Sequence, residues 1–420
     1  MNYESALEYI HKVNWTFCKP GLERISELCR ALGNPQDKLK FVHVAGTNGK
    51  GSFCSMLSSV LTKAGYKTGL YTSPYIKTFN ERMRVDGVNI PNDMLAEITE
   101  KVRPIADAMT DKPTEFELIT AIAFEYFLRA GCDVVVLEAG MGGRLDSTNV
   151  IRNPLLSVIT GIALDHIDYL GDTVEKIAAE KAGIIKDGAP ILFGGDSASA
   201  LEVIKAHAVE KGSRLTSVDY GKLSVKSFTL DGSEFSYKDR ERVKIKLLGE
   251  YQPRNAAVVL EAIDILKERG LEIPEAAVLS GLFEARWQAR FEIISSDPLI
   301  IYDGAHNPQG IESAVRSIKG YFGDKRVIVL SGVLKDKDYR FIAAKLSEIA
   351  AEAVTLTPVS PRALSAEEYA EVLAENGVKA TPVSNISEAF ATAKQIARAA
   401  ELPLVCLGSL YTYVDIIDLI

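Results

Sequence analysis

The stretch Gly46-Thr47-Asn48-Gly49-Lys50-Gly51-Ser52 constrains the fold more than any other part of this sequence. An apolar run over residues 41–44 precedes it and predicts a buried parallel strand, while helical spacing over residues 53–64 follows it. A strand, a glycine-rich turn and a helix form the layout of a phosphate-binding loop, in which backbone N–H groups and the helix N-terminus attract anions. We therefore expect Lys50 to supply a positive charge and Ser52 a hydroxyl that can reach a metal ion.

The loop departs from the common pattern GxxxxGK[ST] at two positions. Val44 stands where that pattern has glycine and Gly51 where it has serine or threonine, so the hydroxyl comes one place later, at Ser52. The sequence is therefore not a strict loop of the GTPase or kinase type. The alternative is a glycine turn that only joins a strand to a helix, with Lys50 in solvent. We disfavour it because Gly, Lys and Ser all fall at one turn.

Composition and charge exclude several classes of protein. The chain has 420 residues, of which 47% are hydrophobic and 25% charged, the balance of a soluble globular protein with two or three domains. The net charge of −8 argues against a nucleic-acid partner. An anionic ligand of such a chain must be held by a local positive site.

The cysteines and the N-terminus bear on the compartment. The five cysteines are scattered and form no CxxC pair, which indicates neither a zinc site nor a disulfide framework. The first residues are polar and amphipathic, without the apolar region of a secretion signal, and no apolar run approaches the length of a membrane span. We expect a cytoplasmic protein with reduced thiols, without a membrane partner, and monomeric.

The order of strands and helices predicts an α/β protein with two domains. Residues 1–294 are expected to form a P-loop ATPase-like domain with a mostly parallel sheet, to which alternation over residues 214–248 adds a small antiparallel β-meander. A short polar link, residues 295–298, leads into a Rossmann-like α/β domain of residues 295–420. The predicted strands of this domain are 299–302, 326–331, 353–356 and 403–407, and its predicted helices are 309–320, 338–351, 365–376 and 386–399.

Three predicted strands after the loop carry a polar group at the carboxyl end: Ser73, Glu138 and His166. Because the carboxyl ends of parallel strands share one edge of a sheet, we expect these groups to lie near a bound phosphate. A hydroxyl, a carboxylate and an imidazole suit Mg²⁺, which keeps few protein ligands beside waters and phosphate oxygens. Taken singly, each residue has a plain alternative, as a cap or as a hydrogen-bonded turn residue.

Two turns of the second domain resemble the first loop in layout. Residues 302–308, YDGAHNP, follow a predicted strand and open a helix, and residues 407–411, LGSLY, do the same at the last strand. Helix N-termini of this kind bind anions, so a substrate with a carboxylate fits them. Ordinary capped turns are the alternative.

Two further stretches bear on ligand contacts. Thr114-Glu115-Phe116-Glu117 is a capping box that predicts the start of an apolar helix. The loop over residues 14–21 carries Trp15 and Phe17 and is either a packed connector or a loop that contacts a ligand.

Seven motifs together carry a resemblance to a known family. In chain order they are GTNGKGS, SPYIKTFNERMRVDG, EAGMGGRLDSTN, DHIDYLG, EKAGIIK, DGAHNPQG and GSLY, and the resemblance extends over nearly the whole chain, from about residue 14 to 411. They resemble the folylpolyglutamate synthase / dihydrofolate synthase family, which belongs to the Mur ligase superfamily of ATP-dependent amide-bond synthetases. GTNGK alone indicates the superfamily, whereas GTNGKGS with FNERMRVDG and DGAHNP is specific to the folate branch.

The resemblance implies an ATP-dependent ligase that adds L-glutamate to dihydropteroate, to folates, or to both, through an acyl phosphate. The residues that it implies for ATP are Thr47, Asn48, Gly49, Lys50, Gly51, Ser52, Asn255, Arg290 and Asp303. The ligands that it implies for two Mg²⁺ ions are Ser73, Glu138, His166 and a carbamylated Lys181. The family also implies a monovalent cation.

The resemblance further assigns substrate contacts and catalytic groups. Residues implied for the pterin and folate are Trp15, Thr16, Phe17, Arg82, Thr114, Phe116, Leu145, Asp146 and Ser147, and those implied for the incoming glutamate are His306 and Ser409. The catalytic set comprises Lys50, Lys181, His166 and His306. The residues alone favour another reading of Lys181, as an exposed helix lysine paired with an acid.

Two departures and two alternatives remain open at the level of the sequence. Tyr251-Gln252 stands where the family often has His-Gln, and Trp287-Gln288-Ala289-Arg290 where Trp-Pro-Gly-Arg is common, which affects the expected adenine contacts and the stiffness of the connection. One alternative is a Mur ligase of peptidoglycan precursors, although only about 40 residues precede the loop, too few for the expected UDP-binding domain. The other is a nucleotide-dependent switch without ligase activity.

Overall fold

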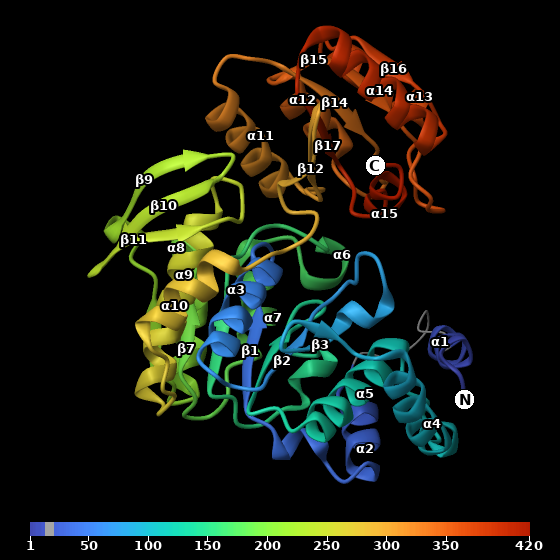
Figure 1. The fold of residues 1–420 in the computed structure, drawn as a ribbon. Coiled ribbons are helices and arrows are strands. Elements are labelled where there is room, and N and C mark those ends of the chain that lie inside the picture. The colour runs from blue at the N-terminus through green and yellow to red at the C-terminus, as the bar shows by residue number, and fades with distance from the viewer. Residues whose placement is uncertain (13–20) are drawn as a thin grey trace. The chain divides into compact units, whose positions relative to one another are not determined.

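The computed structural model describes residues 1–12 and 21–420, and contacts divide these into two compact units (Figure 1). Unit 1 comprises Met1–Lys222 and Arg254–Ala285, and unit 2 comprises Leu223–Pro253 and Arg286–Ile420. The contacts therefore divide the chain at other positions than the boundary predicted at residues 294 and 295. The predicted substrate contacts Trp15, Thr16 and Phe17 lie outside the described residues.

Unit 1 is built on one sheet of eight strands in the order β4-β3-β2-β5-β1-β6-β7-β8. Strands β2, β5, β1, β6, β7 and β8 pair in parallel, and β3 and β4 add an antiparallel edge. The strands are β1 Phe41–Ala45, β2 Thr68–Tyr71, β3 Met83–Val85, β4 Val88–Asn89, β5 Val134–Glu138, β6 Leu156–Ile159, β7 Ile191–Phe193 and β8 Leu215–Ser217. Every residue of β1, β5 and β6 is buried, as expected of strands covered on both faces.

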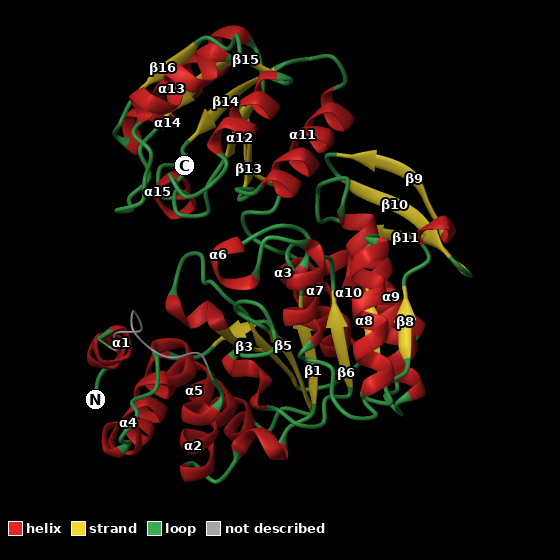
Figure 2. Cartoon of the chain, turned by 180° about the vertical axis from the view of Figure 1, so that it is seen from behind, coloured by secondary structure: helices red, strands yellow, loops and turns green. Residues whose placement is uncertain are grey.

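Helices cover both faces of this sheet (Figures 1 and 2). They are α1 Tyr3–His11, α2 Glu23–Ala31, α3 Lys50–Lys63, α4 Asn92–Ala108, α5 Glu115–Ala130, α6 Ile167–Leu170, α7 Val174–Ala182, α8 Ala198–Glu210, α9 Gln252–Glu268 and α10 Glu275–Glu284. Short 3₁₀ segments lie at η1 Pro35–Lys38, η2 Phe79–Arg82, η3 Ser147–Val150 and η4 Tyr220–Lys222. One apolar cluster joins α2, α4 and α5 to the sheet, and another joins α7 and α8 to it.

Unit 2 combines a mixed six-stranded sheet with a three-stranded antiparallel one. The larger sheet has the order β12-β13-β17-β14-β15-β16, in which β12 alone runs antiparallel to its neighbour. The strands are β9 Leu223–Thr229, β10 Gly232–Tyr237, β11 Arg240–Ile245, β12 Glu292–Ser296, β13 Leu299–Asp303, β14 Val327–Ser331, β15 Ala350–Thr355, β16 Ala380–Pro382 and β17 Leu404–Leu407. The helices are α11 Pro308–Phe322, α12 Tyr339–Ser347, α13 Ala366–Glu375, α14 Ile386–Ala400 and α15 Tyr413–Ile417.

The predicted fold class is confirmed, and two local predictions are corrected. The expected polar link is in part strand β12, because Glu292–Ser296 pairs antiparallel with β13 through a tight turn. The meander begins at Leu223 rather than at residue 214, because β8 pairs in parallel with β7 of the first sheet. Helices α8 and α10 and strand β16 were not predicted from the sequence.

No helix in the described part of the chain has both the length and the apolar character that crossing a bilayer requires.

Candidate active site

The predicted phosphate loop joins β1 to α3, as the sequence indicates. Its conformation depends on Gly49, whose φ of 87° lies in the left-handed region that side chains disfavour. A Cβ added to Gly49 would also stand 2.8 Å from Oδ1 of Asn255, in the first turn of α9. The structure thus brings Asn255 to the loop from a distant part of the sequence.

The end of β6 holds the loop in place. The Thr160 hydroxyl donates a hydrogen bond to the Asn48 carbonyl at 2.8 Å, and the Thr47 N–H donates to the Gly161 carbonyl at 2.7 Å. Thr47 Oγ1 also lies 3.1 Å from both the carbonyl and the N–H of Ala163. Sequence reasoning did not single out Thr160, whose only signal is its place at the carboxyl end of a strand.

Two lysines converge on one carbonyl of the loop. Nζ of Lys50 donates to the Gly46 carbonyl at 2.9 Å and to the Thr47 carbonyl at 3.3 Å. Nζ of Lys181, on α7, donates to the same Gly46 carbonyl at 2.9 Å. Lys181 is only 3% exposed, so the reading of an exposed, acid-paired helix lysine is wrong.

Burial makes the protonated Lys181 side chain lose its proton more easily than an ordinary lysine. It lowers the pKa of Lys181, and the nearby positive charge of Lys50 lowers it further, while Asp165 and Asp146 act against both; the result is a pKa of about 7. Near neutral pH a large part of the amine is therefore uncharged. Lys50, Asp165 and Asp146 thus all lie within electrostatic range of Lys181.

The small residues after Lys181 allow another backbone to approach α7. A Cβ on Gly183 would stand 2.5 Å from the Cα of Arg144, and a Cβ on Gly143 would stand 2.8 Å from the Glu180 carbonyl. The Arg144 N–H donates to that Glu180 carbonyl at 2.8 Å. The loop that follows β5 is thus fixed against the helix that carries Lys181.

Ser73 and Glu138 lie together, as the shared sheet edge predicts. The Ser73 N–H donates to Oε2 of Glu138 at 3.2 Å, and Glu138 is 4% exposed. The pKa of the buried Cys54 thiol is raised by burial and by Glu138 and lowered by Lys50, which places both charges near the first turn of α3. A buried carboxylate near a phosphate loop fits Mg²⁺, which takes its other ligands from waters and phosphate.

His166 occupies the position before α6, with a left-handed φ of 49°. It is exposed, and its N–H donates to Oδ1 of Asp165 at 3.0 Å. Among the described residues, no group of three or more His, Cys, Asp or Glu side chains is arranged to hold a metal. The role of His166 at a metal therefore stays a prediction.

Several residues implied for the pterin lie in or beside the loop that follows β5. A Cβ on Gly140 would stand 2.7 Å from Cζ of Phe116 and 3.2 Å from Oδ2 of Asp146. Asp146 accepts the Met141 N–H at 2.9 Å and the Thr148 N–H at 3.0 Å, and burial raises the pKa of its carboxyl. Ser147 is buried beside it and Leu145 is 39% exposed. Arg82 is the last residue of η2, and its guanidinium lies over the rings of Tyr75 and Phe79.

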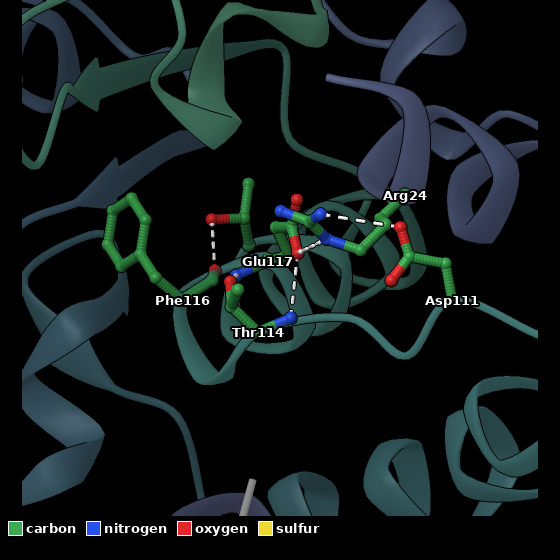
Figure 3. A network of polar contacts seen from close by, with 6 residues as sticks. Arg24, Asp111, Thr114, Phe116 and Glu117 are labelled. Carbon is green, nitrogen blue, oxygen red and sulfur yellow. Dashed lines mark hydrogen bonds and ion pairs between the residues drawn. The ribbon is translucent and has the colours of Figure 1, made fainter. Parts of the chain in front are cut away.

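Thr114 and Phe116 are held by the capped start of α5 (Figure 3). The Thr114 hydroxyl accepts the Glu117 N–H at 3.2 Å, and the Glu117 carboxylate accepts the Thr114 N–H at 2.7 Å, so the predicted capping box is confirmed. Nε of Arg24 donates to the same carboxylate at 2.9 Å, and its guanidinium reaches Asp111 at 3.4 Å. A buried ion pair thus fixes the cap that presents Phe116.

In unit 2, Asp303 ends β13 and is surrounded by donors. Its Oδ2 accepts the Tyr251 hydroxyl at 3.0 Å and the Phe291 N–H at 2.8 Å, and its Oδ1 accepts the Ala305 N–H at 2.8 Å. Burial raises the pKa of the Asp303 carboxyl, and the nearby Arg290 acts to lower it. The structure thus brings the predicted residues Asp303 and Arg290 together.

The two predicted turns of unit 2 adjoin each other. The Gly408 N–H donates to the Ala305 carbonyl at 3.0 Å, which links the end of β17 to the end of β13. Nδ1 of His306 lies 2.8 Å from the Gly304 carbonyl, and the Ser409 hydroxyl accepts the Tyr411 N–H at 3.1 Å. His306 is partly exposed and Ser409 is buried.

The structure shows the surroundings of the two departures from the family pattern, Tyr251 and Ala289, both of which lie in unit 2. Tyr251 donates to Asp303, and burial raises the pKa of its hydroxyl well above the usual value. Ala289, where glycine is common in the family, has a φ of 54°, a conformation that costs an alanine roughly 1 kcal/mol relative to glycine. The chain therefore keeps the backbone turn without the residue that favours it.

Similarity to known proteins agrees with the geometry. Residues 44–263 match the family described as Mur ligase middle domain, and residues 289–409 match Mur ligase, glutamate ligase domain. The chain is 40% identical to a Bacillus subtilis dihydrofolate synthase/folylpolyglutamate synthase over 83% of both chains. It is 38% identical to a Lacticaseibacillus casei folylpolyglutamate synthase over 98% of this chain and 97% of the relative.

Solved structures extend the likeness to the fold. The chain superposes on Escherichia coli FolC, in complex with DHPP and ADP, with a TM-score of 0.86 and 32% identity, covering 100% of this chain and 97% of the other. The order of the motifs, the fold of both units and these likenesses agree. The chain therefore belongs to the folylpolyglutamate synthase / dihydrofolate synthase family of Mur ligases.

Proposed function

We propose that the protein is an ATP-dependent ligase that joins L-glutamate to dihydropteroate, to the γ-carboxylate of folates, or to both. The observation that carries this proposal is the convergence of Lys50 and the buried Lys181 on the Gly46 carbonyl of the phosphate loop. Such a loop serves a nucleotide, and a second, buried lysine at the same carbonyl places another reactive group beside the expected phosphate. The ADP and DHPP bound to the E. coli relative support the same nucleotide and pterin class for this chain.

The reaction class explains why these groups are needed. A carboxylate does not condense with an amine at neutral pH, so ATP first transfers its γ-phosphoryl group to the substrate carboxylate and leaves as ADP. The glutamate amine then attacks the acyl carbon, phosphate leaves, and the amine proton is lost to solvent or a base. Phosphoryl transfer depends mainly on positioning and on neutralising charge.

We propose the nucleotide contacts that the family resemblance implies. Thr47 to Ser52 and Asn255 are proposed to hold the phosphates, which is supported by the contact of Asn255 with Gly49. Arg290 and Asp303 are proposed as further ATP contacts, and their mutual electrostatic interaction supports a shared role.

We assign two Mg²⁺ ions to Ser73, Glu138, His166 and Lys181. Bound Mg²⁺ would neutralise phosphate charge as it develops during transfer. For Lys181 we propose a carbamate, formed when the neutral amine adds CO₂ and loses a proton. The low pKa of Lys181 supports this, because only the neutral amine reacts and an ammonium would repel a cation. A monovalent cation is proposed by the family resemblance alone.

The remaining proposals concern the substrate contacts, the oligomeric state and the cellular compartment. The pterin or folate is proposed to contact Arg82, Thr114, Phe116, Leu145, Asp146 and Ser147, together with Trp15, Thr16 and Phe17, and the incoming glutamate to contact His306 and Ser409. The link between the turns of His306 and Ser409 supports the second set. We further propose a monomer in the cytoplasm, in keeping with the free, buried thiols of Cys29, Cys54, Cys132 and Cys406.

One experiment tests the proposal and its alternatives. Purified protein is given ATP, Mg²⁺ and L-glutamate with dihydropteroate, with tetrahydrofolate or with a UDP-linked muramyl acceptor, and ADP release and the glutamylated product are measured side by side. We expect both to rise together with at least one acceptor. Product formed only with a UDP-linked muramyl acceptor would favour a peptidoglycan ligase, and ADP release without any product would favour a nucleotide switch.

A further inference from the structure

The motif EKAGIIK contains two lysines, and the proposed function gives a role only to Lys181. The other, Lys186, lines a cavity of about 530 Å³ whose walls come from segments that precede β1, β6 and β7. The cavity therefore lies toward the amino edge of the parallel sheet, whereas the phosphate loop follows β1 at the opposite edge. No residue proposed above for ATP, metal or substrates lines it, and its volume is that of a small-molecule site.

The charges that line the cavity are mostly positive. They are Arg30, Arg152, Lys186 and Lys211, against the single carboxylate of Asp187. Lys211 pairs with Asp187 at 3.1 Å, whereas no ion pair among the described residues includes Arg30 or Arg152, both of which are exposed. In a chain of net charge −8, this local excess favours an anion in the cavity.

Lys186 is held at the cavity wall and carries an uncharged amine more often than an ordinary lysine does. Its Nζ donates to the Asn149 carbonyl at 2.9 Å. Burial and then the charge of Lys211 lower the pKa of Lys186 to about 8, while Asp187 acts in the other direction. His43 of β1 also lies within electrostatic range and is uncharged, because burial lowers its pKa to about 3. At pH 8, about half of the Lys186 amine is therefore unprotonated, against less than about 1% for the usual pKa of 10.5.

An uncharged amine among cations suits one class of reagent. The unprotonated amine is a nucleophile, and it keeps its electron pair free while one N–H donates to Asn149. The cations that line the same cavity attract a reagent that is itself an anion. An acyl phosphate meets both conditions, because it carries negative charge and releases phosphate when an amine attacks its acyl carbon.

We propose that the cavity recruits small acyl phosphates and that Lys186 is acylated there without a second enzyme. The phosphate group of the reagent faces Arg30, Arg152 and Lys211, and the Lys186 nitrogen attacks the acyl carbon. A C–N bond forms, the bond from the acyl carbon to the bridging oxygen breaks, and phosphate leaves with that electron pair. The amine proton passes to phosphate or solvent, and no group is oxidised or reduced. The amide product is uncharged and keeps one N–H for the Asn149 carbonyl.

The test is acetylation of the full chain by acetyl phosphate, in which peptide mass spectrometry gives the rate at each lysine. At pH 8 we expect Lys186 to react about tenfold faster than Lys205 and Lys325, two exposed lysines outside the cavity. The rate at Lys186 should level off above about pH 8, where most of its amine is already unprotonated, whereas an amine with the usual pKa of 10.5 gains reactivity up to pH 10. Equal rates at the three lysines, or a rate at Lys186 that rises steadily to pH 10, would overturn the site.

Two double variants separate recruitment by the cavity from the reactivity of the amine. Arg30→Gln with Arg152→Gln removes two exposed cavity charges, and Arg269→Gln with Lys226→Gln removes two exposed charges that do not line the cavity. With acetyl phosphate, the rate at Lys186 should fall about tenfold in the cavity variant and stay unchanged in the control. Acetic anhydride carries no charge, so its reaction with Lys186 should be the same in all three proteins. A cavity variant that loses nothing with acetyl phosphate, or loses equally with the anhydride, would overturn recruitment by the cavity.

Discussion

Lys181 combines burial, a neighbouring cation and contact with the phosphate loop in one residue. Its folded pKa of about 7 lies below the usual 10.5, so between these values the folded protein binds fewer protons than the unfolded chain. The free energy of unfolding should therefore rise with pH across this window, by roughly 1 kcal/mol per pH unit at most.

The first prediction is that Lys181→Met removes this dependence. Denaturant unfolding in CO₂-free buffer at several values between pH 7 and 10 gives the free energy of unfolding for both proteins. We expect the difference between wild type and variant to change steadily with pH and to favour the variant at the lower end. Parallel curves would mean that the amine is ordinary.

The second prediction concerns activity at the same residue. Lys181→Ala should lower ligation roughly 10- to 100-fold, because the carbamate oxygens are lost from the metal site. Added formate or acetate should restore part of the activity, since a small carboxylate can occupy the vacated space. Lys205→Ala, with the same change on the surface of α8, serves as the control for the effect of the added salt.

The third prediction is that Glu138 sets the need for magnesium. Glu138→Gln keeps the size of the side chain but removes its charge, so the Mg²⁺ concentration for half-maximal ligation should rise about tenfold or more. The titration is compared with that of Glu180→Gln, which removes a carboxylate paired with Arg144 instead. An unchanged Mg²⁺ requirement would exclude Glu138 as a ligand.

At the scale of elements, the start of α5 connects stability to the substrate site. Glu117 closes the capping box and pairs with Arg24, and both side chains are less than a tenth exposed. The fourth prediction is that Glu117→Ala lowers the free energy of unfolding by about 3 kcal/mol or more, because Arg24 then stays buried without its partner. Thr114→Ala should cost about 1 kcal/mol, the usual value for a lost cap.

The control is Asp172→Ala, which breaks an exposed pair with Lys176 and should leave the unfolding transition unchanged. A similar result for Glu117→Ala would show that the buried pair contributes nothing.

The sequence predicted the elements with strong periodicity and missed those defined by distant partners. The apolar run into Glu138 and the capping box at Thr114 each contain their own signal, and both predictions are confirmed. Strand β8 has three residues and the same alternation as the meander, so only its pairing with β7 reveals its sheet. Strand β12 contains two serines and became recognisable only through β13.

The candidate site shows the same limit. Lys50 and Ser52 follow from the loop itself, whereas the residues alone favoured an exposed Lys181. Burial by the loop that contains Gly143 and Arg144 reverses that reading, and no local pattern encodes it. The approach of Asn255 to Gly49 likewise came from family resemblance, because it depends on how α9 packs.

At the scale of the molecule, the meander belongs to unit 2 although unit 1 resumes after it. The Gly249 N–H donates to the Tyr321 hydroxyl at 2.8 Å, and the Phe228 and Tyr321 rings stack with centroids 4.0 Å apart. The fifth prediction is that a fragment of residues 295–420 fails to unfold cooperatively in thermal circular dichroism, since it lacks most of β12, Tyr251 and the meander.

A rescue fragment sharpens this test. Residues 223–253 joined by a Gly-Ser linker to residues 286–420 restore every part of unit 2. We expect this fusion to unfold in one transition, and equal behaviour of the two fragments would contradict the division.

The threading of the chain between units also sets an order on the ribosome. Unit 1 is complete in sequence once Ala285 has emerged, with all of its sheet and both of its late helices available. The meander is synthesised earlier than α9 but has to wait for α11, which carries Tyr321, the ring that stacks on Phe228 of β9. The hydroxyls of Ser317 and Tyr321 also accept the N–H groups of Glu250 and Gly249, just after the meander. Nascent chains halted after Ala285 but before α11 should therefore hold a folded unit 1, while the meander stays sensitive to protease. The nucleotide loop should form before unit 2 folds.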